Sequence, residues 1–231
     1  MPPPELRHLP RVPELLHAAL DLAGAGRARV SVWRAAEPER VLAEALPPAW
    51  RTGLPRHPDR RRETLAARRC LLALVPGAAD TRVVREPTGR PRLEGRPDLH
   101  FSLTHSHGHA AALVAERPCG VDLQRRVEKI TRLRGKFERD DERRGVEAAE
   151  DPTGALHVLW GAKESLFKLW SRRVIDWHEH LVVDAFDYRA AGGGLRGEVR
   201  KTAPALRAAG FYRWVGADDA LCLVGLAQAD Y

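Results

Sequence analysis

The residues best suited to chemistry stand in one stretch, Trp160-Gly161-Ala162-Lys163-Glu164-Ser165-Leu166-Phe167-Lys168. In a helix, Glu164 and Lys168 lie one turn apart on the flank of an apolar arc, a spacing that is common for surface ion pairs. Lys163 instead projects near the middle of that arc, where a packing helix would carry Leu or Ala, and such a conflict is typical of functional sites. A buried ammonium needs an anion. The stretch therefore predicts a helix that carries a charged site.

A second candidate is Gly120-Val121-Asp122-Leu123-Gln124. In a strand, the period of two turns Asp122 and Gln124 to the same face. Two oxygen-bearing side chains on one face can bind a hard cation such as Mg²⁺, which prefers oxygen ligands and keeps several waters. An Asp at a strand end is also commonly structural, so this signal is weak by itself.

A third candidate runs from Phe101 to His109 and follows Thr88-Gly89-Arg90-Pro91. The alternate histidines His105, His107 and His109 would share one face of a strand, which leaves a zinc site open as an alternative. The hydroxyl of Thr104, the imidazole of His105 and the guanidinium of Arg90 are all donors to phosphate oxygens. Phosphate binding is the favoured interpretation, because no carboxylate or cysteine at a suitable spacing completes a zinc ligand set.

Taken together and in this order, these segments resemble the 4′-phosphopantetheinyl transferases of the surfactin-synthetase type. Four signatures carry the resemblance: Thr88-Gly89-Arg90-Pro91, Ser102-Leu103-Thr104-His105-Ser106, Gly120-Val121-Asp122-Leu123-Gln124, and Trp160 with Lys163-Glu164-Ser165 and Lys168. The resemblance spans roughly Arg56 to Lys168, and its last signature is the most specific.

The resemblance implies an α+β fold of two pseudo-symmetric halves, each with a small antiparallel sheet and a packed helix. Coenzyme A and Mg²⁺ would bind between residues 1–117, the coenzyme A-binding half, and residues 118–231, the half with the metal site and the catalytic helix. The implied reaction moves phosphopantetheine from coenzyme A to a serine of an apo acyl or peptidyl carrier protein and releases adenosine 3′,5′-bisphosphate.

Roles for individual residues follow from the same resemblance. Asp122 and Glu164 would hold Mg²⁺ against the pyrophosphate, and Glu164 or a metal-bound water would help to deprotonate the carrier serine. Lys168 would neutralise charge on the transferred phosphate. Gln124 is a third candidate ligand, ranked last because many relatives have Glu there and an amide can ligate only through its carbonyl oxygen or a water. The groups expected to bind the phosphates of coenzyme A are Arg56, Arg62, Arg90, Thr104, His105, Lys163 and Lys168.

The expected secondary structure brings these segments together only through long-range packing. The first elements that the pattern predicts are a helix at Glu14 to Leu22 and a strand at Arg29 to Trp33, followed by a helix at Asp59 to Leu74. Short strands are expected next, then a helix around Ile130 to Phe137 and the long helix from Gly154 to Arg172. Further strands follow, of which the first covers Leu181 to Tyr188. The order suggests helix then strands, twice over.

Composition narrows the function classes. The chain has 231 residues and a formal net charge of +7, which favours anionic ligands and partners such as acidic carrier proteins. A nucleic-acid-binding module stays open as an alternative because arginines cluster at Arg56, Arg60, Arg61, Arg62, Arg68 and Arg69, and so does a coenzyme A-binding homologue with weakened catalysis. Three separated cysteines suggest a reducing cytoplasm, and no apolar run is long enough to cross a bilayer. We expect a monomer with no membrane and no nucleic-acid partner.

Overall fold

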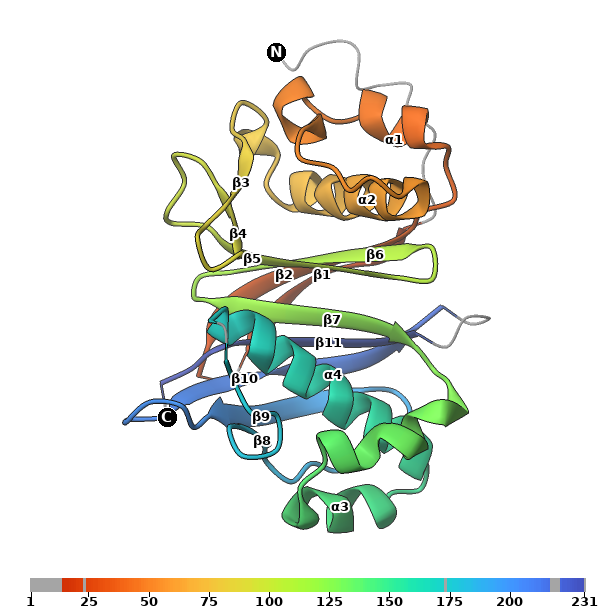
Figure 1. Cartoon of the computed structure of the whole chain (residues 1–231), viewed down its shortest axis with the longest axis vertical. Coiled ribbons are helices and arrows are strands. Elements are labelled where there is room, and N and C mark those ends of the chain that lie inside the picture. The colour runs from red at the N-terminus through yellow and green to blue at the C-terminus, as the bar shows by residue number, and fades with distance from the viewer. Residues whose placement is uncertain (1–13, 23, 173, 217–220, 231) are drawn as a thin grey trace.

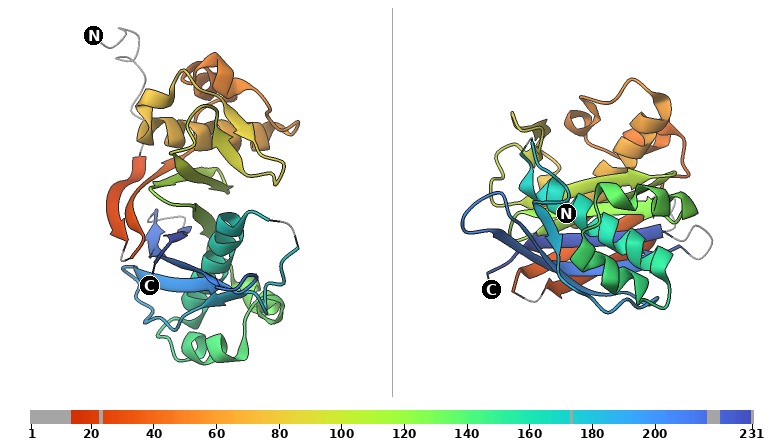
Figure 2. Two further views of the ribbon diagram at one scale, coloured as in Figure 1. Left: turned by 90° about the vertical axis from the view of Figure 1, so that its left-hand side faces the viewer. Right: turned by 60° about the horizontal axis from the view of Figure 1, so that its bottom comes forward.

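Two stacked antiparallel sheets form the centre of the protein, and each is covered on its outer face by one long helix (Figure 1). The computed structural model describes residues 14–22, 24–172, 174–216 and 221–230. The side view shows α2 above the first sheet and α4 beside the second (Figure 2). The expected α+β fold, with two halves each built from an antiparallel sheet and a packed helix, is confirmed.

The first sheet has the order β1 (Glu14–Leu22), β2 (Gly26–Arg34), β6 (His109–Ala115), β5 (His100–Ser106). The second has the order β7 (Cys119–Arg125), β11 (Leu221–Gln228), β10 (Leu206–Val215), β9 (Gly193–Val199), β8 (Leu181–Val183). A separate two-stranded ribbon consists of β3 (Val83–Arg85) and β4 (Pro91–Leu93). The helices are α1 (Glu39–Glu44), α2 (Pro58–Leu74), α3 (Asp140–Glu147) and α4 (Pro152–Trp170), with 3-10 turns at Pro48–Arg51, Pro76–Ala78 and Glu128–Lys136.

The core lies in three layers between these elements. Side chains such as Val30 and Leu113 of the first sheet pack against Leu123 and Leu223 of the second. Every residue of β6 is buried, because one face of this strand meets α2 and the other meets the second sheet. Small apolar residues are suited to such a position, and the Ala-rich sequence of β6 fits it.

The first expected helix is wrong: Glu14–Leu22 is strand β1. It pairs along its length with β2, from Glu14 opposite Trp33 to Leu22 opposite Gly26. Gly24 and Gly26 have φ of 80° and 78°, which lets the chain reverse tightly between the two strands. Because the hairpin satisfies the backbone of this segment in a sheet, tertiary pairing overrides its helical pattern. The first half therefore begins with a hairpin rather than a helix.

Most other expected elements are confirmed, including the helices that became α2 and α4 and the strands that became β2, β5, β6 and β7. Two differ in extent or kind. The strand expected at Leu181 to Tyr188 ends at Val183, and the helix expected around Ile130 is a 3-10 segment. The sheets divide the chain between Ala115 and Cys119. The assignment of coenzyme A binding to residues 1–117 and of metal binding and catalysis to 118–231 stays a prediction.

The two sheets meet where the edge strands β5 and β7 lie side by side. The hydroxyl of Ser102 on β5 accepts a hydrogen bond from the backbone N–H of Val121 at 3.1 Å, and that of Thr104 accepts from Leu123 at 3.2 Å. These hydroxyls take the place of ladder carbonyls for two amides of β7. On its other flank, β7 approaches α4 so closely that a Cβ at Gly120 would lie 1.9 Å from the carbonyl oxygen of Ser165. Three elements distant in sequence thus converge at β7.

No helix in the described part of the chain combines the length and the apolar character needed to cross a membrane.

Candidate active site

Lys168 joins all three of the converging elements. From the last turn of α4, its ammonium donates to Asp122 Oδ1 on β7 at 2.9 Å and to the Val121 carbonyl oxygen at 2.8 Å. It also donates to Thr104 Oγ1 on β5 at 3.3 Å. The Lys168 side chain is 27% exposed and that of Asp122 is 11% exposed, so the ion pair lies at the bottom of an opening rather than in the core.

Glu164 lies one turn before Lys168 on α4 and is the third charged group of the site. Burial, and then the nearby carboxylate of Asp122, raise the pKa of Glu164 to about 7, while Lys168 lowers it. Asp122 thus lies near enough to Glu164 to affect its ionisation, and a shared metal site of the two carboxylates stays a prediction. Asp122 pairs with Lys168 and Glu164 has no ion-pair partner of its own among the described residues, so an ionised Glu164 would add a negative charge that a cation could neutralise.

This donor set fits Mg²⁺. Both carboxylates offer oxygen ligands, and Mg²⁺ usually binds one or two carboxylates while it keeps waters for the substrate phosphates to displace. Among the residues that the structure describes, no group of three or more His, Cys, Asp or Glu side chains is gathered as a metal site. The same finding leaves the zinc alternative without support, because His105, His107 and His109 do not form such a group.

Gln124 shares a face of β7 with Asp122 but is held by α4, and its expected role as a metal ligand stays a prediction. Its amide nitrogen donates to the carbonyl oxygen of His157 at 3.0 Å, and its amide oxygen lies 3.1 Å from His157 Nδ1. His157 is buried, and its Nε2 also meets the backbone of Val127. Because both ends of the amide are engaged, Gln124 serves to fasten β7 to α4.

Lys163 lies in a buried ion pair, which contradicts its expected role in binding coenzyme A. The expected anion is present, since Glu142 Oε2 lies 2.7 Å from Lys163 Nζ, but both side chains are buried. The ammonium also donates to the carbonyl oxygens of Phe137 at 2.5 Å and Trp177 at 3.4 Å. Burial lowers the pKa of Lys163 and Glu142 raises it. With its ammonium enclosed by protein oxygens, Lys163 offers no donor to coenzyme A.

A cavity of about 240 Å³ connects Lys168 with the Thr88–Pro91 signature. Arg90 lines it, and the Nη2 atom of this arginine is buried with no hydrogen-bond partner among the described residues. A buried guanidinium nitrogen without an acceptor is costly, and a phosphate oxygen would satisfy it. The cavity is thus suited to an anionic group beside the ammonium of Lys168.

His105 follows Thr104 on β5 and lies near the charges of Lys168, Arg60 and Glu63. Burial, foremost, and the positive charges of Arg60 and Lys168 lower its pKa, whereas Glu63 raises it. Glu63 Oε2 is 2.9 Å from His105 Nδ1. The motifs did not single out Glu63, because it stands within an arginine-rich segment and is distant in sequence from its partner.

The two other arginines expected to bind phosphate, Arg56 and Arg62, make no hydrogen bond or ion pair to the residues around Lys168 among those that the structure describes. Arg62 has a buried Nε without a partner in the described part of the chain and lies 3.9 Å from Asp59. Arg56 is exposed, and its backbone oxygen accepts from Arg61. No contact brings either residue to Lys168, so their expected phosphate contacts stay predictions.

Part of the basic cluster on α2 faces inward, which weakens the nucleic-acid alternative. Arg68 is buried and donates to the carbonyl oxygens of Trp50 and Thr52 at 2.5 Å and 2.7 Å. Arg69 is also buried and pairs with Glu37 at 3.4 Å. These guanidinium groups hold the segment before α2 rather than form a stripe that could follow a phosphate backbone.

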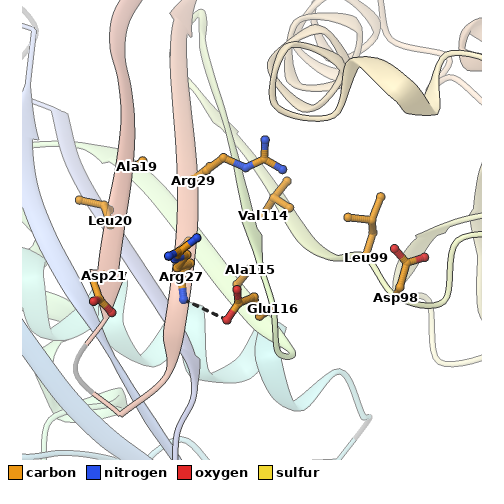
Figure 3. A pocket seen from close by; sticks show the side chains of 11 residues that line it. Ala19, Leu20, Asp21, Arg27, Arg29, Asp98, Leu99, Val114, Ala115 and Glu116 are labelled. Carbon is orange, nitrogen blue, oxygen red and sulfur yellow. Dashed lines mark hydrogen bonds between the residues drawn. The ribbon is translucent and has the colours of Figure 1, made fainter.

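A larger cavity of about 590 Å³ lies elsewhere, beside β1 and β2 (Figure 3). Its charged lining has both signs, with Arg27 and Arg29 near Asp21, Asp98 and Glu116. None of the motif residues lines it, so its size does not make it the better candidate site.

The comparisons with known proteins agree with the site rather than with the larger cavity. Residues 118–206 match the family model described as the 4′-phosphopantetheinyl transferase superfamily. This confirms the family resemblance. The matched segment includes Asp122, Glu164 and Lys168 and excludes the phosphate-binding candidates before residue 118. A 4′-phosphopantetheinyl transferase of Bacillus subtilis is 25% identical over 108 residues, which cover 46% of this chain and 46% of the relative. The match thus spans about half the length of the curated 4′-phosphopantetheinyl transferase.

Proposed function

We propose that the protein transfers 4′-phosphopantetheine from coenzyme A to a serine of an apo acyl or peptidyl carrier protein and releases adenosine 3′,5′-bisphosphate. One observation carries the proposal: β7 and α4 bring Asp122, Glu164 and Lys168 into a single charged group within the segment that matches the family. Phosphoryl transfer needs positioning and charge stabilisation more than covalent help, and this group is equipped for both.

In the proposed reaction the serine oxygen forms a bond to the phosphorus that carries the pantetheine arm, and the bond from that phosphorus to the bridging oxygen of the pyrophosphate breaks. Asp122 and Glu164 would hold Mg²⁺, which when bound supplies positive charge beside the pyrophosphate. Lys168 neutralises charge on the transferred phosphoryl group. Glu164, or a water, accepts the serine proton.

Coenzyme A would enter from the cavity between the halves. Arg90 offers its unpartnered Nη2 to a phosphate oxygen. Thr104 and His105 follow each other along β5 near Lys168, where they would add donors to the phosphate-binding site. The net charge of +7 would steer an acidic carrier protein to the enzyme, in a manner that salt weakens. A cytoplasmic monomer remains our expectation.

Incubation with coenzyme A, Mg²⁺ and a panel of apo-carrier proteins tests the proposal, with intact mass as the readout. We expect at least one carrier to gain the mass of one phosphopantetheine group, and the gain to disappear when its acceptor serine is replaced by alanine. Carriers that all keep their mass, while the protein still binds coenzyme A, would indicate the weakened homologue. Tight, salt-dependent binding of duplex DNA without coenzyme A binding would indicate the nucleic-acid module.

A further inference from the structure

Glu63 on α2 holds the turn between β5 and β6 through two contacts. Oε2 lies 2.9 Å from His105 Nδ1, and Oε1 accepts from the backbone N–H of Gly108 at 3.3 Å. The Glu63 side chain is 12% exposed, so water competes little for either oxygen. Gly108 and the preceding His107 both have positive φ, 74° and 49°, so the tether acts on a tight turn.

The charges around His105 show why a carboxylate is needed there. Arg60 on α2 and Lys168 on α4 both disfavour a positive imidazole, and Glu63 favours it. Arg60 Nη1 itself lies 3.9 Å from Glu63 Oε2 and 3.5 Å from His105 Nδ1. Without Glu63, the imidazole would stand beside two cations with no compensating charge. A protonated ring, the form that can donate to a carboxylate and a phosphate at the same time, would then be disfavoured further.

The geometry also distinguishes the two ring nitrogens. A histidine whose Nδ1–H binds a carboxylate has its tautomer fixed, and the other nitrogen is left for the ligand. Nδ1 of His105 lies 2.9 Å from Glu63 Oε2, which accepts, and 3.5 Å from Arg60 Nη1, which donates. The shorter contact favours the Nδ1–H tautomer, and Nε2 has no hydrogen-bond partner among the described residues.

From this arrangement we propose that Glu63 is a positioning residue, which binds the Nδ1–H of His105 and leaves Nε2 to bind a phosphate group of coenzyme A. The identity of the ligand rests on the proposed function; the orientation of His105 does not. When the phosphate binds, the ring takes one proton from solvent at Nε2, and the resulting imidazolium lies between Glu63 and the phosphate.

The first test is the tautomer of His105 in the ligand-free protein, read from two-bond ¹⁵N–¹H NMR correlations. The resonance is assigned by its loss in His105→Asn. We expect the Nδ1–H tautomer in the wild type and a shift toward Nε2–H in Glu63→Ala. A wild-type ring protonated only at Nε2, or a tautomer that Glu63→Ala leaves unchanged, would overturn the proposal. This test holds even if the protein fails to bind coenzyme A, an outcome that would count against the proposed function alone.

The second test is a double-mutant cycle on coenzyme A affinity, measured by calorimetry with Glu63→Gln and His105→Asn. Glu63→Gln removes the charge and keeps an oxygen for the Gly108 N–H, so the turn should remain folded. We expect each single variant to weaken binding about tenfold, and the double variant to be little weaker than His105→Asn, as for a coupled pair. Effects that multiply in the double variant would show that Glu63 does not act through His105.

Glu39→Gln is the matched control. Glu39 makes a similar contact to α2, with Oε1 2.9 Å from Arg61 Nε, but does not contact His105. We expect it to leave both the tautomer and the affinity unchanged. A loss of affinity equal to that of Glu63→Gln would assign the effect to the charge of the surface and overturn the positioning role.

Discussion

Two lysines of α4, five residues apart, show how differently one helix can use the same side chain. Lys163 and Lys168 each have a carboxylate within 3 Å, Glu142 at 2.7 Å and Asp122 at 2.9 Å. Lys163 is fully buried and Lys168 is 27% exposed. Each ammonium has three oxygen partners: one carboxylate and two backbone carbonyls for Lys163, and one carboxylate, the Val121 carbonyl and the Thr104 hydroxyl for Lys168. Only Lys168 lines a cavity among those described.

The difference lies in whether a ligand can reach each ion pair. Lys163 and Glu142 neutralise each other inside the protein, so the pair fixes α3 against α4 and offers nothing to a ligand. The pair of Lys168 and Asp122 is partly exposed and lies near Glu164, whose pKa is raised to about 7 by burial and then by Asp122. Full burial thus indicates a structural lysine, and partial exposure at a cavity beside a further carboxyl group indicates a functional one.

The largest effect should come from breaking the buried ion pair of Lys163 and Glu142. Lys163→Met leaves the Glu142 carboxylate buried without its cation, which should lower the free energy of unfolding by about 3–5 kcal/mol. Urea denaturation provides the measurement. Adding Glu142→Gln should restore part of the loss, because the uncompensated charge is then gone. A Lys163→Met protein as stable as the wild type, with coenzyme A affinity lost, would instead make Lys163 a ligand-binding residue.

At the partly exposed pair of Lys168 and Asp122, we expect a loss of catalytic rate. Lys168→Ala should lower the single-turnover rate by about 10²–10³-fold, as when one preorganised donor to developing charge is removed. Coenzyme A affinity, measured by calorimetry, should fall less than this. The reverse pattern, with affinity reduced more than the rate, would assign Lys168 to ground-state binding.

The pKa of Glu164 makes the stability of this region depend on pH. Its pKa is about 7 in the folded protein against an ordinary value of 4.5, so between these values the folded state binds more protons than the unfolded state. Stability should therefore fall as pH rises from about 5 to 7. Melting temperatures in the presence of a chelator should show this slope, and Glu164→Gln should reduce it. An identical slope in Glu164→Gln would mean that this carboxyl is not the group that titrates.

The smallest effect is expected at Gln124. Gln124→Glu places a carboxylate against the carbonyl oxygen of His157, which now accepts from the amide. We expect a loss of about 1–2 kcal/mol in unfolding free energy and no gain in Mg²⁺ affinity by calorimetry. A clearly tighter Mg²⁺ complex would show that this position ligates the metal when it carries a charge.

The sequence predicted the elements whose pattern is set locally. The periodicity of α4 and the alternation in β7 were sufficient to place Glu164 with Lys168 and Asp122 with Gln124. The hydroxyls of Ser102 and Thr104 could be assigned to one strand, but their role in joining β5 to β7 depends on contacts between two sheets. Glu14–Leu22 was mistaken for a helix for the same reason, since its partner β2 determines its structure.

At the site, the sequence could not predict which residues the charged and polar side chains contact. That Lys163 needed an anion followed from its position in an apolar arc, but only the fold shows that the anion is Glu142, inside the protein. The alternation of β7 places Gln124 on the same face as Asp122, but the structure shows its amide in contact with His157. His157 stands among apolar residues of α4, so the sequence did not indicate this contact. Glu63 gave no signal beyond being an acid among arginines.

Single-turnover transfer by Glu164→Gln, followed by intact mass of the carrier protein, tests the central claim most directly. We expect no phosphopantetheine on the carrier over a time in which the wild type modifies all of it, with a melting temperature at pH 7 no lower than that of the wild type. Transfer at the wild-type rate would show that the charged group of Asp122, Glu164 and Lys168 is not where the reaction occurs.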